Sequence, residues 1–196
     1  MRVSTVQQRG TVPFPVFLGE RIHMRAFTKS DGLAPALRRW QPTVDAMLDG
    51  IDVDGPIFLM IDQADVPPGS AHRRPGVHVD GYWQAGAQAH KHNFEPEPAE
   101  QPPADRHVVE RQFGIRAETI LLATDVLGCV AYAGSYDDQP AEGGDCSHID
   151  VSKMDRVEFE PGRVWAGSAL GMLHESIAAR RAGPRTVVRL NVPGWA

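Results

Sequence analysis

Two His-x-Asp triplets in the sequence have residue types suited to metal chemistry, His78-Val79-Asp80 and His148-Ile149-Asp150. In an extended chain, alternate side chains point to opposite faces. His78 and Asp80 would therefore project together, with Val77 and Val79 on the other face. An imidazole and a carboxylate are two of the three ligands in a 2-His-1-carboxylate triad, which leaves positions open on Fe(II) for oxygen chemistry.

The third ligand of such a triad would be a histidine from a distant strand. His174 is the candidate, in a segment that follows one strand-like run and precedes the last one. About five strand candidates separate Asp80 from His174, whereas only about two separate Asp150 from it. The spacing favours His78, Asp80 and His174 as the ligands over the second triplet.

The last strand-like run, residues 185–192, contributes two cations. Its alternation places Arg185, Val187 and Arg189 on one face. A guanidinium pointing into a protein interior is costly unless it meets an anion, and its fork suits a carboxylate. We therefore expect an organic acid bound at Arg185, with Arg189 as the alternative.

This set of residues resembles the Fe(II)/2-oxoglutarate-dependent oxygenases over residues 75–82 and 163–192. The resemblance implies a double-stranded β-helix, or jelly roll. It also implies Fe(II) held by His78, Asp80 and His174, and 2-oxoglutarate anchored by Arg185. The implied activity is a dioxygenase that hydroxylates a substrate the sequence does not identify.

Short β-like runs recur along the whole chain, separated by turn signals such as Pro161-Gly162. They predict a mainly β fold, in which residues 1–196 form one jelly-roll domain. The predicted strands cover residues 12–18, 21–27, 56–61, 77–80, 107–113, 119–124, 126–133, 156–160, 163–166 and 185–192.

A single helix is expected outside the sheets, over about residues 31–50. Its apolar residues recur at steps of three and four, which places them on one helix face. Ser30 and Asp31 are candidate N-caps. Pro42 would fall inside this helix and lacks a backbone N–H, so we expect a break near Gln41.

Residues 91–105 form a proline-rich insert, which is typical of a long loop and a candidate lid. Tyr82 and Trp83 follow the predicted metal strand and suit either core packing or substrate contact. The sequence His90-Lys91-His92 with Glu95 weakly resembles the metal motif of cupins, but a solvated loop is the stronger interpretation.

The charge balance and the apolar content argue against a nucleic-acid-binding protein and against a membrane-spanning one. The chain has 20 basic and 25 acidic side chains, a formal net charge of −5. This balance does not indicate nucleic-acid binding. No run approaches the roughly 18 apolar residues of a membrane span, and residues 1–10 lack the apolar core of a signal peptide. We expect two free thiols at Cys129 and Cys146, with one disulfide as the alternative, in a cytoplasmic protein.

A second class of function is compatible with the same fold. Jelly rolls also build viral capsids and lectins, so the fold alone does not establish catalysis. The alternative is a non-catalytic assembly protein, for example a homo-oligomer or a component of a virion or another large particle. Under the leading hypothesis, the partner is instead a small-molecule co-substrate.

Overall fold

The computed structural model describes residues 1–80, 118–193 and 195. Antiparallel strands dominate these residues, and a short helical segment flanks them, which confirms the mainly β prediction. The strands are β1 (Arg2–Ser4), β2 (Gln7–Thr11), β3 (Arg21–Thr28), β4 (Pro56–Val66), β5 (Glu118–Thr124), β6 (Cys129–Tyr136), β7 (Asp155–Glu158), β8 (Arg163–Ser168), β9 (Leu173–Ser176) and β10 (Gly183–Pro193).

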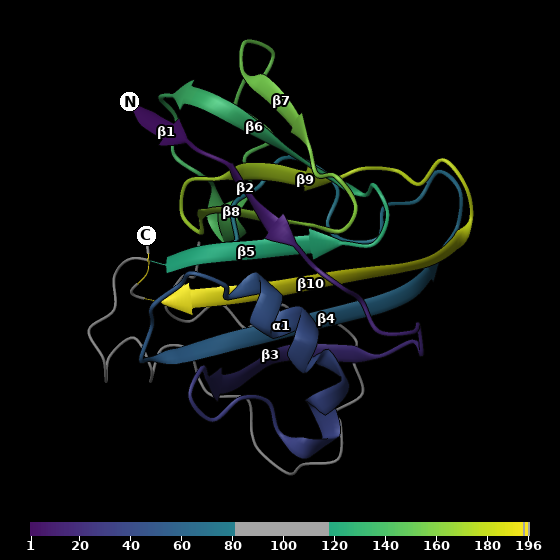
Figure 1. Cartoon of the computed structure of the whole chain (residues 1–196). Coiled ribbons are helices and arrows are strands. Elements are labelled where there is room, and N and C mark those ends of the chain that lie inside the picture. The colour runs from purple at the N-terminus through teal and green to yellow at the C-terminus, as the bar shows by residue number, and fades with distance from the viewer. Residues whose placement is uncertain (81–117, 194, 196) are drawn as a thin grey trace.

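The strands form two sheets (Figure 1). The larger sheet has six strands in the order β2-β8-β5-β10-β4-β3. The smaller sheet has the order β1-β6-β7, and β9 also pairs with β6. β10 therefore lies in the middle of the six-stranded sheet, hydrogen-bonded to β4 on one side and to β5 on the other.

The two faces of β10 contact different layers. Val188, Leu190 and Val192 belong to a buried core that also contains Trp40 and Val44 from the helical segment. The intervening residues face the smaller sheet, as shown by Ile120 and Leu122 of β5, which pack with Cys129 and Ala131 of β6. The strict alternation of β10 thus turns its apolar side toward the helix and its arginines toward the interior between the sheets.

The helical segment is shorter than predicted and divided in two. A 3-10 helix, η1, spans Pro35–Trp40, and the α-helix α1 spans Gln41–Met47. The predicted break near Gln41 is confirmed, because Pro42 occupies the first turn of α1, where its missing N–H costs nothing. A second 3-10 helix, η2, spans Glu142–Gly144.

The predicted caps and the predicted strand over residues 12–18 are wrong. Ala34 precedes η1 without a side-chain cap, and Asp31 instead accepts a hydrogen bond from Thr28 Oγ1 at 2.6 Å. The first strands end at Thr11, and residues 12–20 are irregular because Pro13 and Pro15 cannot donate to a sheet.

Several predictions fall outside the described residues. They are the strand over residues 107–113, the insert over residues 91–105, and the roles of Tyr82, Trp83, His90, His92 and Glu95. Within the described residues, Cys129 and Cys146 are buried free thiols, as expected. No helix in this part of the chain is long and apolar enough to cross a membrane.

Candidate metal centre

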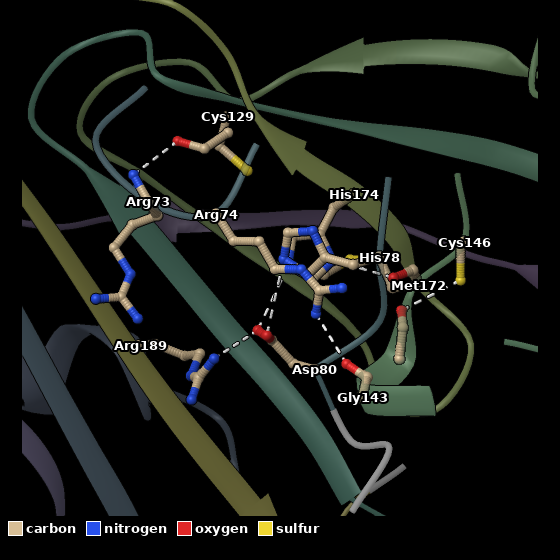
Figure 2. Close-up of polar contacts among 12 residues, drawn as sticks. Arg73, Arg74, His78, Asp80, Cys129, Gly143, Cys146, Met172, His174 and Arg189 are labelled. Atoms are coloured by element: carbon tan, nitrogen blue, oxygen red, sulfur yellow. Dashed lines mark hydrogen bonds and ion pairs between the residues drawn. The ribbon is translucent and has the colours of Figure 1, made fainter. Parts of the chain in front are cut away.

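His78, Asp80 and His174 come together in the interior between the sheets (Figure 2). One donor atom from each residue lies within 4.8 Å of the other two. Asp80 Oδ1 is 3.9 Å from His78 Nε2, and Asp80 Oδ2 is 3.4 Å from His174 Nε2. Since metal–nitrogen and metal–oxygen bonds are about 2.0–2.2 Å long, this spacing suits one ion between the three side chains.

The backbone places the two imidazoles side by side. His78 pairs with His174 through two backbone hydrogen bonds of 2.9 and 3.0 Å, and the ring centroids are 4.5 Å apart. Within residues 77–80 only His78 forms β-bridges, one to His174 and one to Asp145, so the continuous strand that we predicted there is wrong. The predicted alternation is nevertheless present: Val77 and Val79 pack in a separate apolar cluster.

In both histidines, a hydrogen bond at Nδ1 fixes the orientation of the ring. His78 Nδ1 lies 2.7 Å from the carbonyl oxygen of Gly76, and His174 Nδ1 lies 3.1 Å from that of Met172. A carbonyl oxygen can only accept a hydrogen bond, so each Nδ1 carries the proton. The lone pair of each Nε2 is then free and directed toward Asp80, as in histidines that ligate metals.

The protonation states also suit a cation. Burial lowers the pKa of His78 to about 4, and the repulsion that two protonated imidazoles would feel at His78 and His174 adds to this effect. Burial alone would raise the pKa of Asp80, but Arg189, His174 and His78 together outweigh it and hold this pKa well below 3.8. At neutral pH the site therefore offers a neutral His78 and an ionised carboxylate, the forms that bind metal ions.

The two candidate arginines have different partners. Arg189 Nη1 lies 2.6 Å from Asp80 Oδ2, so this guanidinium is already paired with a carboxylate (Figure 2). Arg185 is buried, and its Nη1 donates to the carbonyl oxygen of Leu127 at 3.2 Å. Among the described residues, no carboxylate lies within ion-pair distance of Arg185. A buried cation without a counter-charge is costly, which favours Arg185 as the binding site for an anion.

The inward face of the six-stranded sheet also carries unpartnered polar atoms. Asp62 and Thr124 lie on either side of Val187, and Trp165 is two strands from Arg189 across Leu122. Within the described residues, five side chains on this face have a buried atom without a hydrogen-bond partner: Asp62 Oδ1, Thr124 Oγ1, Trp165 Nε1, Arg189 Nε and Asn191 Oδ1. Buried polar groups are usually satisfied, so this face is suited to a polar occupant.

Sequence reasoning missed one ionic cluster next to this face. Asp62 on β4 lies 2.6 Å from Arg73 Nη1 and 3.5 Å from His72 Nε2. Burial alone would raise the pKa of Asp62, but the adjacent His72 and the hydrogen bond and charge of Arg73 lower it to about 2. An aspartate directly after the apolar run Ile57–Ile61 was the available signal, since a charge there requires a partner.

The ionic cluster of Asp62, His72 and Arg73 should make the folded protein less stable in acid. Because the pKa of Asp62 is lower in the folded protein than in the unfolded one, its contribution is present above about pH 4 and is lost as pH falls toward 2. A shift from 3.8 to about 2 corresponds to about 2 kcal/mol. Urea unfolding between pH 2 and 6 should show a flatter acid limb for Asp62→Asn than for the wild type. Equal pH dependence of the two proteins would contradict the assignment.

The second His-x-Asp triplet lies outside the metal centre. His148 is exposed, and its Nε2 contacts the carbonyl oxygen of Gln139 at 3.0 Å. Asp150 is also exposed and accepts a hydrogen bond from the backbone N–H of Ser152. The choice of the first triplet thus agrees with the geometry.

The chain matches no model of a known protein family and no curated protein sequence. The chemistry of the site therefore has to be argued from its own residues.

Proposed function

We propose that this protein is an Fe(II)- and 2-oxoglutarate-dependent dioxygenase. The observation that carries the proposal is the His78–Asp80–His174 group, together with a buried Arg185 on the same face of β10 as Arg189, which contacts Asp80. Three protein ligands leave about three positions on an octahedral ion, enough for a chelating 2-oxo acid and oxygen. Arg185 would pair with the far carboxylate of 2-oxoglutarate, since its guanidinium has no carboxylate partner among the described residues.

The order of strand pairing supports the jelly-roll part of the proposal. Counting from β4, with residues 77–80 as the second element, the first strand pairs with the last, β10. The second element pairs with β9 through His78 and His174, the third (β5) with the sixth (β8), and the fourth (β6) with the fifth (β7). Such nested antiparallel pairing of seven strands and one bridged segment suits a double-stranded β-helix.

Each residue of the site has a defined task in this proposal. His78, Asp80 and His174 would hold Fe(II), which when bound supplies the coupled decarboxylation of 2-oxoglutarate and hydroxylation of a C–H bond. The carbonyls of Gly76 and Met172 keep the Nε2 atoms aimed at the ion.

The proposal is tested by mixing the protein with Fe(II) and 2-oxoglutarate in the absence of oxygen. We expect a weak visible charge-transfer band that requires both additions and disappears in the double variant His78→Ala, Asp80→Ala. The matched control is His148→Ala, Asp150→Ala, which alters the exposed triplet and should leave the band unchanged. Absence of the band in folded wild-type protein would refute the proposal and favour the alternative of a non-catalytic assembly protein.

A further inference from the structure

Arg189 holds one of the two oxygens of the metal carboxylate. Its Nη1 lies 2.6 Å from Asp80 Oδ2, the length of a strong charge-assisted hydrogen bond. The same oxygen also lies 3.4 Å from Nε2 of His174, whereas the other oxygen, Oδ1, faces Nε2 of His78 at 3.9 Å. A divalent ion beside this carboxylate would meet a guanidinium on the Oδ2 side, and the two like charges repel each other.

The Arg189 guanidinium also has a contact away from Asp80. Arg189 is buried in the centre of the six-stranded sheet, directly opposite Met60 on β4 and Leu122 on β5. Its second terminal nitrogen, Nη2, contacts the sulfur of Met24 at 3.4 Å. Arg189 thus touches Asp80 at one end of its fork and a buried thioether at the other.

Met24 reaches this position through a strained backbone. Its φ of 45° is the only positive φ of a non-glycine residue in the described part of the chain. It lies at a register shift between Ile22 and Arg25, where β3 is irregular against β4. Bulges often redirect a side chain, and a non-glycine residue held at a positive φ is strained. The strain brings the Met24 side chain against Arg189, Phe58 and Met60.

From these contacts we propose that Arg189 is a positioning residue that restricts Asp80 to binding the metal through one oxygen, with Met24 as its support. A carboxylate can bind a metal through one oxygen or through both. If both oxygens of Asp80 bound, one of the positions needed for exogenous ligands would be lost. The inference rests on the metal site of the proposed function, and it assigns Arg189 a task different from that of Arg185.

The number of water molecules on a bound Mn(II) ion tests this inference. Three protein ligands leave about three of six positions for water, and a second oxygen from Asp80 would reduce this number to about two. We expect water-proton relaxation per bound Mn(II) to fall by about one third in Arg189→Met. Arg189→Lys keeps a cation and should restore most of the wild-type value. Unchanged relaxation in Arg189→Met with Mn(II) fully bound would overturn the inference.

The variant Met24→Ala tests whether Met24 supports Arg189. It also replaces Arg189→Met in the experiment if that variant does not fold. It leaves room for the guanidinium to move, so relaxation should change in the same direction as in Arg189→Met. The matched control is Met47→Ala, which empties a similar volume in the core on the other face of the sheet. Equal relaxation in Met24→Ala and Met47→Ala would overturn the role of Met24. A change in relaxation without the Fe(II)–2-oxoglutarate band would refute the proposed function and leave this inference standing.

Discussion

Asp80→Ala should weaken the binding of divalent metal ions by more than about 100-fold. Even residues that only orient metal ligands contribute about 10–100-fold in affinity, and Asp80 is the sole carboxylate in the described metal group. The same substitution leaves Arg189 buried without its carboxylate, so the apoprotein should lose about 3–5 kcal/mol of stability. Titration calorimetry with Mn(II) measures the first effect, and urea unfolding measures the second.

Two further variants separate these effects. Asp150→Ala removes an exposed aspartate from the second His-x-Asp triplet and should change neither quantity. The double variant Asp80→Ala, Arg189→Met removes both charges. It should recover stability relative to Asp80→Ala without recovering metal affinity, because the unpaired buried cation is gone but the ligand is still missing. Wild-type Mn(II) affinity in Asp80→Ala would exclude the proposed metal centre.

Arg185→Met should weaken the binding of 2-oxoglutarate by about 100-fold and leave the binding of the metal unchanged. Loss of one partner from a buried charge pair costs about 2–5 kcal/mol, and 100-fold corresponds to about 2.7 kcal/mol. The metal affinity should persist because Arg185 contacts a backbone carbonyl and none of the three ligands. Anaerobic titration of the Fe(II) protein with 2-oxoglutarate, followed by the visible band, gives both values.

Arg181→Met is the matched control, since Arg181 is exposed in the segment that leads into β10. It should bind 2-oxoglutarate as the wild type does. Folding of Arg185→Met should be at least as stable as the wild type without ligand, because no described carboxylate loses a partner. If Arg189→Met weakened 2-oxoglutarate binding 100-fold and Arg185→Met did not, the anchor would be Arg189.

Much of the architecture follows from local pattern. Alternation predicted β10 and the shared face of Arg185 and Arg189, and the position of Pro42 predicted the break at Gln41. Alternation also placed Val77 and Val79 on the face opposite His78. These features depend on backbone geometry over a few residues, which the sequence expresses directly. The irregular segment after Thr11 was predicted as a strand because of its apolar residues, although Pro13 and Pro15 cannot donate hydrogen bonds to a sheet.

The distinction between the two arginines was beyond local pattern. Both point to the same face, so periodicity treats them alike. Their partners depend on which residues lie nearby in three dimensions: Asp80 for Arg189, and the Leu127 carbonyl for Arg185. The Met24 contact also depends on the register shift in β3, which arises from pairing with β4 rather than from the residues themselves.

By itself, the sequence of this protein determined which three residues could hold a metal ion, but not the elements that carry them: residues 77–80 form no continuous strand, and β9 was not predicted. Only the tertiary structure decided that His78 pairs with His174 and that Asp80 is ion-paired with Arg189. The physical reason is that ligand identity is a property of single residues. The pairing of the two histidines and the charge pairing of Asp80 with Arg189 arise between segments about 100 residues apart, and strand register sets them.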